Sequence, residues 1–416
     1  MLRQWLLVMV LLFPLYSIAQ HNTSDSTKVI KTKKKKKKKK TKDPYAPKKW
    51  ALNGYVKQMS SLLFINDPML SFIYPNKMMQ DNLLHNRINF SWYISDAFTF
   101  KTDLRTRIFY GEVVRSIPNY GDLVDNANND FFDLSWVVLN EKAAVIHTMI
   151  DRLYLDFAKG NWQVRLGRQR INWGINTMWN PHDIFNAYNF TDFDYAERPG
   201  SDALRVQYYT GVASSIELAV KVFDKWEEAT AGLLWKFNKW NYDFQALAGI
   251  TNNDLVGGLG WAGNLGTAGF KGEMSYFYSL GDSVATRHSF AASLGFDYIF
   301  SNGVYLNGGL LYNSNGIVNG SISQLFTFEL SAKNLYPYKY SMVLAAGHAF
   351  TPLISGNLSV VYSPGESHAV FISPTITYSI KENWDIDLIG QITLNKSGNK
   401  YISPMQFIFL RLKWSF

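Results

Sequence analysis

From residue 50 onward, the chain repeats short segments in which apolar and polar side chains alternate. Residues 86–94 and 101–108 alternate most cleanly. A period of two places successive side chains on opposite faces of a β-strand. We therefore expect an all-β fold whose strands each have one apolar and one polar face. The other segments with this pattern are 150–157, 162–169, 203–209, 215–222, 231–237, 289–299 and 385–394.

The connections between these segments alternate between short and long. A soluble β-sandwich also has alternating strands, but its turns are mixed in length. Short periplasmic turns and long extracellular loops are typical of an outer-membrane barrel. We therefore predict a transmembrane antiparallel up-and-down β-barrel of 18 strands, or of 16 because the Gly-rich residues 254–279 are ambiguous. The short turns are 95–97, 160–161, 238–239, 301–303, 351–352 and 381–383; the long loops are 66–82, 112–146, 171–202, 223–229, 280–287, 315–336, 364–368 and 395–400.

The N-terminus reads as an export signal. Arg3 precedes an apolar stretch over residues 5–15, and Ser17-Ile18-Ala19 has the small-x-small form of a cleavage site. The alternative, an anchoring helix, would need about 20 apolar residues. No later stretch approaches 18 apolar residues, so crossing a membrane would require a closed barrel. We predict a signal peptide at 1–19, cleavage after Ala19 and a barrel at 50–416 in the cell outer membrane.

The last segment has the features of a closing strand. Ile408, Leu410, Leu412, Trp414 and Phe416 alternate with polar residues and form one apolar face. A terminal aromatic residue on such a strand resembles the assembly signal that the barrel-insertion machinery reads. Trp414 and Phe416 are therefore candidate contacts for that machinery, and the outer face is expected to contact outer-membrane lipid.

Composition supports a membrane barrel. The 13 Trp, 24 Tyr and 28 Phe residues make up 16% of the chain, and two interfacial girdles of a barrel would use them. The net charge of +9 comes from one tail. Fourteen of the 42 Lys and Arg residues, but only two of the 33 Asp and Glu residues, precede Trp50. The remainder is slightly acidic, so the basic total does not indicate nucleic-acid binding.

The tail itself, residues 20–49, contains eight consecutive lysines at 33–40. Like charges repel and nothing apolar compensates, so we expect a disordered periplasmic segment. Its partner could be anionic lipid headgroups or an acidic periplasmic protein. The alternative is a solvated tail without a partner. An export signal excludes a nuclear or DNA-binding role.

If the apolar alternates face lipid, their polar neighbours face the lumen. A charged side chain facing lipid would cost about 2–4 kcal/mol at mid-membrane. This predicts a wall with eight bases and three acids, which favours anions. The alternative is that Arg–Asp ladders brace neighbouring strands. The second half, rich in Gly, Ser and Asn, would form a smoother wall. The predicted pore-lining residues are Arg87, Lys101, Asp103, Arg105, Arg107, Arg152, Asp156, Arg165, Arg205, Glu217 and Lys221.

Residues 165–205 combine a strand end with a long aromatic loop. Arg168 and Arg170 offer guanidinium forks to carboxylates such as Asp183, Asp192, Asp194 or Glu197. The aromatic side chains favour a loop that folds into the pore mouth as a constriction, although its Arg, Gln and Trp residues could serve only to pin it. The predicted constriction-loop residues are Arg168, Gln169, Trp173, Asn180, Asp183 and Arg198.

The same segment carries a family resemblance. Leu166-Gly167-Arg168-Gln169, Trp173-Gly174, Asn180-Pro181 and Asp183, followed by Asp202-Ala203-Leu204-Arg205, resemble the alginate-export and related porins of Gram-negative, Bacteroidota-like bacteria. The resemblance implies an 18-stranded barrel with an arginine-rich lumen that conducts an anionic polysaccharide. That role would map to Arg165, Arg168, Gln169 and Arg205. The inserted Asn172-Trp173-Gly174 and Asn180-Pro181 depart from the alginate pattern, so the resemblance implies a porin but not alginate.

The leading functional class is a porin for small polar or anionic solutes, without a cofactor. A closed structural or surface-polysaccharide-associated barrel is the alternative. A barrel-embedded hydrolase would need a Ser–His or Asp–His constellation, and no nucleophile motif or metal-ligand spacing surrounds the histidines. The chain has no cysteine and so no thiol metal site. The seven histidines are His21, His85, His147, His182, His288, His348 and His368.

Overall fold

The computed structural model describes residues 48–67, 76–126, 130–187, 194, 197–281, 287–320, 325, 328 and 330–416. The predicted signal peptide and residues 20–47 of the Lys-rich segment lie outside the described residues. So do Tyr188, Phe190, Asp192, Phe193 and Tyr195 of the long aromatic loop.

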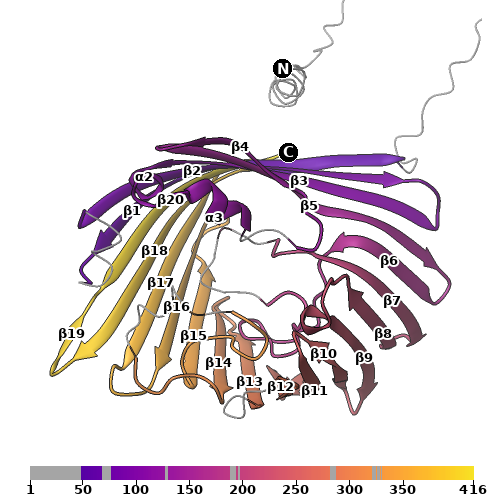
Figure 1. Ribbon diagram of the computed structural model, residues 1–416. Coiled ribbons are helices and arrows are strands. Elements are labelled where there is room, and N and C mark those ends of the chain that lie inside the picture. The colour runs from indigo at the N-terminus through magenta and orange to yellow at the C-terminus, as the bar shows by residue number, and fades with distance from the viewer. Residues whose placement is uncertain are drawn as a thin grey trace, which may run out of the picture. The chain divides into compact units, whose positions relative to one another are not determined.

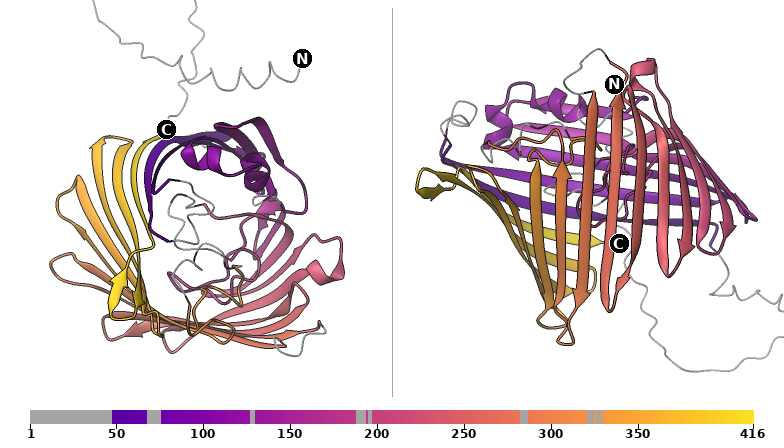
Figure 2. Two further views of the ribbon diagram at one scale, coloured as in Figure 1. Left: turned by 60° about the vertical axis from the view of Figure 1, so that its left-hand side comes forward. Right: turned by 90° about the horizontal axis from the view of Figure 1, so that it is seen from below.

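The strands form one closed antiparallel barrel (Figures 1 and 2). Eighteen strands make the ring, and β4 and β19 are short additions that pair with the ends of β5 and β18. Pairing of β1 with β20, from Tyr55 opposite Ser415 to Ile65 opposite Met405, closes the ring. The predicted 18-strand barrel is therefore confirmed.

The Gly-rich residues 254–279, which left a count of 16 open, form two strands, β11 and β12. The strands are β1 (Trp50–Ile65), β2 (Met78–Tyr93), β3 (Phe98–Gly111), β4 (Ser135–Glu141), β5 (Ala144–Lys159), β6 (Trp162–Gln169), β7 (Ser201–Gly211), β8 (Ser214–Lys221), β9 (Thr230–Lys239), β10 (Tyr242–Thr251), β11 (Asp254–Leu265), β12 (Ala268–Ser279), β13 (His288–Ile299), β14 (Tyr305–Asn313), β15 (Tyr340–Ala349), β16 (Ile354–Ser363), β17 (Ala369–Lys381), β18 (Trp384–Ser397), β19 (Lys400–Ile402) and β20 (Met405–Ser415).

The two ends of the barrel differ, as the sequence predicts. Short turns join strands at one end, called here the turn end, and most long connections lie at the other, the loop end. One connection departs from the expected alternation of short and long: β10 and β11 meet at the loop end through only Asn252 and Asn253, both with positive φ. The turn expected at 238–239 lies instead at Trp240-Asn241, which also have positive φ, because β9 continues to Lys239.

Side chains alternate across the wall, and β8 shows this most simply. Ile216 and Leu218 point outward with 40% and 45% of their surface exposed, whereas Ser215 and Glu217 are buried inside. Exposed aromatic side chains lie at both ends of the barrel, as two interfacial girdles would, with Trp136 and Trp226 at the loop end and a larger set at the turn end. Those with the largest exposure there are Trp50, Trp92, Trp162, Trp240 and Phe350.

The predicted loop 112–146 is partly ordered structure. It contains α2 (Glu112–Ser116), α3 (Tyr120–Asn126) and β4, and β5 already begins at Ala144. Both helices lie inside the ring of strands (Figure 2). A third short helix, η3 (Trp226–Glu228), lies between β8 and β9. None of the helices in the described ranges is long and apolar enough to cross a membrane.

The C-terminus contacts the seam, which is the pair of strands β1 and β20 that closes the ring. Phe416 exchanges two backbone hydrogen bonds with Gly54 of β1, at 2.9 and 3.0 Å. A Cβ at Gly54 would lie 2.1 Å from the carbonyl oxygen of Arg87 and 2.8 Å from the Phe416 ring. The glycine therefore permits the close approach of the two terminal strands. Trp414 stacks with Trp384 across the neighbouring strand pair, with ring centroids 6.0 Å apart.

Candidate functional site

The predicted lumen residues form ion pairs across neighbouring strands. Arg87 of β2 donates from Nη2 to Asp103 of β3 at 3.0 Å and from Nη1 to Asp151 of β5. Its Nε donates to Asn89 at 2.8 Å, so the whole guanidinium is engaged. Arg87 is 2% exposed. This arrangement supports the alternative that Arg–Asp ladders brace the wall.

Asp151 is inside because β5 contains an irregularity. Asp103 of β3 lies opposite Arg152, but the next residue, Leu104, lies opposite Ile150. The register shift places Asp151 and Arg152 both on the inner face, where strict alternation would admit only one of them. Arg152 donates to Asp151 and to the backbone carbonyls of Glu197 and Arg198. It therefore ties the wall to the long loop.

The remaining predicted bases are also engaged. Two form close pairs with acids on the adjacent strand: Arg165 with Asp156 at 2.9 Å and Arg205 with Glu217 at 2.7 Å. The other contacts are Lys221 with Asp130, Lys101 with Asp103 at 3.8 Å, Arg105 with the sulfur of Met149 at 2.8 Å, and Arg107 with His147 at 3.2 Å.

The described parts of the loop between β6 and β7, residues 170–187, 194 and 197–200, lie inside the barrel (Figure 2). One carboxylate holds its first part. Glu273 of β12 accepts the backbone N–H groups of Ile175 and Asn176 on Oε1, and that of His182 on Oε2 at 3.2 Å. Glu273 is 1% exposed. Both arms of the loop's bend thus converge on a single side chain.

Trp173 anchors the same part of the loop against the wall. Its indole N–H donates to Glu217 of β8, and its ring packs with Ile184 and Phe185 in an apolar cluster that includes Leu234 of β9. A Cβ at Gly232 would lie 2.8 Å from the Trp173 ring. Further along the wall, Gly258, Gly260 and Gly295 make similar room for His182, Ile175 and Asn176. The Gly-rich half, predicted as a smooth wall, is the surface on which this loop sits.

His182 is held as a neutral ring. Burial is the main cause that lowers the pKa of His182 to about 4. Gln245 of β10 donates to Nδ1 at 2.6 Å, and Nε2 lies 3.2 Å from the carbonyl oxygen of Met274. An accepting Nδ1 and a donating Nε2 match one tautomer of a neutral imidazole. His182 therefore packs the loop and adds no charge to the lumen at neutral pH.

A second anchor holds the loop to the opposite wall. The Asp194 carboxylate contacts three side chains at the seam. Its oxygens lie 2.8 Å from the Nζ of Lys57 on β1, 3.1 Å from the Nδ1 of His85 on β2 and 3.5 Å from the Nη1 of Arg411 on β20. These strands lie at the seam, about halfway round the ring from β12. The described parts of the loop therefore reach both walls and narrow the lumen between them.

The Asp194 anchor should persist in mildly acidic solution. Burial alone would raise the pKa of the Asp194 carboxyl, but the hydrogen bond from His85 and the charge of Lys57 outweigh it and hold that pKa below its usual range. An acid with a depressed pKa stabilises the fold above the unfolded value, near 3.9, and loses this only as pH falls towards the lower folded value. We expect the anchor to be intact from pH 7 down to pH 5.

Hydrogen–deuterium exchange of peptides containing Glu197–Gly200 measures this. Protection, corrected for the intrinsic rate, should be equal at pH 7 and pH 5, and Asp194→Asn should lower it at both. Loss of protection in the unmodified protein between those pH values would contradict the assignment. Asp297→Asn, at an ion pair that shares no residue with the Asp194 anchor, is the matched control.

The predicted constriction residues do not all lie in the loop between β6 and β7. Arg168 and Gln169 end β6 and belong to the wall. Arg168 pairs with Asp202 of β7 at 2.6 Å. Among the described loop carboxylates expected as its partner, Asp183, Asp194 and Glu197, none takes that role. Gln169 donates to the carbonyl oxygen of Ala203 at 3.0 Å.

The other constriction residues are in the loop itself. Asp183 accepts the backbone N–H groups of Trp173 and Gly174 at 2.7 and 2.8 Å, and its second oxygen lies 3.9 Å from Arg198. Asn180 is buried against Gly174. Arg170, expected to bind a carboxylate, donates to Asn172 at 2.7 Å.

Three important residues escaped sequence reasoning. Lys57 and His85 sit on strands whose alternation would have placed them inside. Glu273 lies in the Gly-rich stretch where the strand pattern was ambiguous. Each of these residues contacts a loop residue more than 90 positions away in the sequence. The alternation of apolar and polar residues does not predict contacts between such distant positions.

A hydrolase site is not assembled among the described residues. Ser135, Asp125 and His147 come together, but Asp125 Oδ1 accepts from the Ser135 hydroxyl and also lies 3.0 Å from the Nε2 of His147. The aspartate stands between hydroxyl and imidazole, which is not the order of a serine nucleophile and its base. No cluster of potential metal ligands is found in the described ranges.

No family model matches this chain, and no curated protein matches it. Several solved structures share the fold. OccAB4 of Acinetobacter baumannii has a TM-score of 0.55 at 9% identity, covering 90% of this chain and 100% of that one. The outer membrane protein OpdK of Pseudomonas aeruginosa gives 0.54 at 8%, covering 88% and 98%. OpdK with vanillate gives 0.52 at 9%, with the same coverage. The chain is thus similar in fold to these proteins, and no match shows membership of the alginate-export family.

Proposed function

We propose that this protein is an outer-membrane channel for passive diffusion of small polar solutes, and not an enzyme. The observation that carries the proposal is the closed barrel with an apolar exterior, a charged interior and a loop folded across that interior. In membrane barrels that act as porins, the interior is polar because water and solutes occupy it. The likeness to an outer membrane protein solved with vanillate supports the same class.

Two cavities flank the inward loop. One, of about 440 Å³, opens near the loop-end termini of β7, β8 and β10. The other, also about 440 Å³, lies nearer the turn end between Ile175 of the loop and Lys236 of β9. A solute would pass from one to the other along the edge of the loop, which makes the loop the selective part of the route.

The predicted anion preference is part of the proposal, but it should be modest. Ion pairs neutralise much of the predicted basic wall, and the base best placed to act is one the sequence analysis did not select. Lys236 is the one base among the described residues that line the turn-end cavity, where Asp243 is the one acid. Its charge therefore acts on the passing solute.

Lys236→Gln should lower the chloride-to-potassium permeability ratio, because it removes this cation from the route. We expect a change of less than about twofold, since a wet lumen screens single charges. Reversal potentials of single channels in a potassium chloride gradient measure the ratio. Lys239→Gln, at the exposed end of the same strand, should leave it unchanged. Cation preference in the unmodified channel would contradict the anion assignment.

The alternative is a closed barrel with a structural or surface-polysaccharide-associated role. The loop that reaches both walls favours it. Conductance in planar bilayers separates the two functions: discrete openings support the channel, and their complete absence with correctly folded protein supports the closed barrel.

The proposal includes export and assembly. Residues 1–19 would be cleaved after Ala19, and Trp414 and Phe416 at the seam would contact the barrel-assembly machinery. The Lys-rich segment 20–49 would then lie in the periplasm beside anionic headgroups or an acidic protein. Mass spectrometry of the mature N-terminus tests the cleavage site directly.

A further inference from the structure

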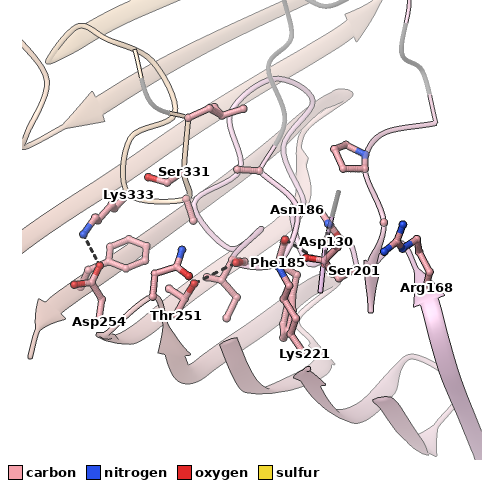
Figure 3. A pocket seen from close by; sticks show the side chains of 18 of the residues that line it. Asp130, Arg168, Phe185, Asn186, Ser201, Lys221, Thr251, Asp254, Ser331 and Lys333 are labelled. Atoms are coloured by element: carbon pink, nitrogen blue, oxygen red, sulfur yellow. Dashed lines mark hydrogen bonds and ion pairs between the residues drawn. The ribbon is translucent and has the colours of Figure 1, made fainter. Parts of the chain in front are cut away.

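The outer face of the barrel carries a group of polar side chains on one side only. Inside the barrel, polar groups are largely paired with one another. In the loop-end cavity shown in Figure 3, for example, Lys333 contacts Asp254 and Lys221 contacts Asp130. The polar side chains on the outside have fewer partners, and they lie on the neighbouring strands β1, β2, β3 and β5.

Alternation along these strands shows which side chains face outward. On β1, Lys57 reaches Asp194 inside the barrel, so the next residue, Gln58, faces out. On β2, His85 and Arg87 are both buried in the lumen, so Asn86 between them faces out. Strand pairing brings further outward polar residues beside these two. The outer polar patch consists of Gln58, Ser60, Asn82, Asn86, Thr106 and Thr148.

The patch lies at the depth of the hydrocarbon core. Gln58 and Asn86 are near the middle of strands β1 and β2, which have 16 residues each. Apolar outward side chains follow on both sides: Leu62 lies towards the loop end of β1, and Ile88 and Phe90 lie towards the turn end of β2. The apolar band of a membrane barrel is about 25 Å tall, and the patch interrupts it from within.

The other side of the barrel has no comparable patch in its described strands. Every Asn and Gln on strands β7–β18 lies on the inner face. The central outward positions there are apolar and exposed, as in Leu218, Leu259, Leu344 and Leu388. Lipid therefore suits the outer face of these strands, whereas the face formed by β1, β2, β3 and β5 differs from it in chemistry.

The amides of the patch have incomplete hydrogen bonding. Gln58 Nε2 donates to the Tyr110 hydroxyl at 3.2 Å, Ser60 donates to Asn82 Oδ1 at 2.8 Å, and Asn86 Nδ2 donates to a backbone carbonyl at 3.3 Å. Among the described residues, no partner is found for Gln58 Oε1, Asn82 Nδ2 or Asn86 Oδ1. Lipid chains offer no hydrogen bonds, so open amide groups are costly against them. A polar surface that covers the patch would remove this cost.

A second copy of this chain has the chemistry to cover it. The patch carries no charge, and amide side chains both donate and accept, so the patch is complementary to itself. A two-fold axis along the membrane normal keeps every residue at its own depth, and the patches of two copies would therefore meet. A ring of three copies needs a second, different face that fits the patch. The described strands β7–β18 offer no such polar face.

We propose that the chain forms a two-fold symmetric dimer in the membrane, with the outer polar patch at the centre of the interface. Amide groups of one copy hydrogen-bond to those of the other. Each barrel keeps its own lumen, so the dimer is independent of what passes through the channel.

Cross-linking tests the interface directly, because the chain has no cysteine. Gln58→Cys, Asn82→Cys and Asn86→Cys are made as separate variants of the full chain, placed in phosphatidylcholine vesicles and oxidised with copper phenanthroline. We expect at least one of them to give a disulfide-linked dimer that persists when the vesicles contain more lipid per protein. Leu344→Cys, at a central outward position of β15, should stay monomeric. Yields no higher in the patch than at Leu344 would overturn the proposal.

Energy transfer between labelled copies measures the strength of association. Asp96→Cys, in the exposed turn between β2 and β3, carries the donor or the acceptor dye. Gln58→Leu combined with Asn86→Leu should weaken association at least about tenfold, since symmetry removes each interfacial contact twice. Leucine suits a lipid-facing position, so this variant should fold. Leu344→Ala should leave association unchanged.

The remaining outcomes are also decisive. Energy transfer that disappears on dilution with lipid in the otherwise unmodified chain would show that lipid or a different protein covers the patch. Transfer that survives the double leucine substitution would place the contact on another face. Native mass spectrometry of the full chain should give a dimer, and a trimer would overturn the two-fold arrangement.

Discussion

Glu273→Ala should release the inward loop and raise the single-channel conductance about twofold or more, the largest change expected for a single substitution in the lumen. The carboxylate accepts three backbone N–H groups, from Ile175, Asn176 and His182. Gln245 of β10 also contacts both arms, through the Trp173 carbonyl oxygen and the His182 ring, but it accepts none of these three N–H groups. Each buried N–H without an acceptor costs about 1–3 kcal/mol. The loop would therefore move away from β12, so that water could hydrogen-bond to these three N–H groups.

Single-channel recordings in planar bilayers measure this, and Asp297→Ala is the matched control. Asp297 is a lumen carboxylate on the adjacent strand whose ion-pair partner is Lys271 of the wall. Its loss should leave conductance unchanged. If Glu273→Ala also leaves conductance unchanged while the protein folds, the loop does not limit conduction, and the edge of the loop is not the route.

The second large effect is on stability. Arg87→Met should lower the free energy of unfolding by about 3–5 kcal/mol, because it leaves Asp103 and Asp151 buried without their shared cation. Both carboxylates are less than 5% exposed. Unfolding by guanidinium of protein refolded into lipid vesicles measures the change.

Arg165→Met is the comparison for that measurement. It removes a guanidinium from an Arg–Asp pair on the same side of the barrel, but the two side chains are 20% and 18% exposed. A hydrated pair contributes about 0–1 kcal/mol. Equal losses for the two variants would show that burial does not distinguish these pairs.

The two Arg→Met variants distinguish the two interpretations of the charged wall, as an anion-selective surface or as Arg–Asp pairs that hold neighbouring strands together. Arg87, Arg152 and Arg168 are buried and bound on more than one side, so they stabilise the wall and its loop. The bases that line the loop-end cavity are also paired, so Lys236 beside the turn-end cavity is the base best placed to act on a solute. Selectivity would thus come from a few positions beside the loop and not from the whole predicted basic half.

Much of the fold was accessible from the sequence. The alternation in residues 162–169 predicts β6 with its bounds, and the strand count and the closing strand were also predicted correctly. This is possible because the direction of a strand side chain depends on local backbone geometry, with a period of two. The inward position of Glu217 and the outward positions of its neighbours follow from the same rule.

Pairing and loop placement depended on the tertiary structure. Alternation could not reveal that an irregularity brings Asp151 inside beside Arg152, since a bulge breaks the period that the prediction uses. It could not link Asp194 to Lys57, 137 residues away, because closure of the ring decides which residues meet across the lumen. The sequence by itself determined a barrel with a polar interior, since that depends on local geometry. Only the tertiary structure decided which charges cancel and which remain for a solute, since that depends on contacts between distant strands.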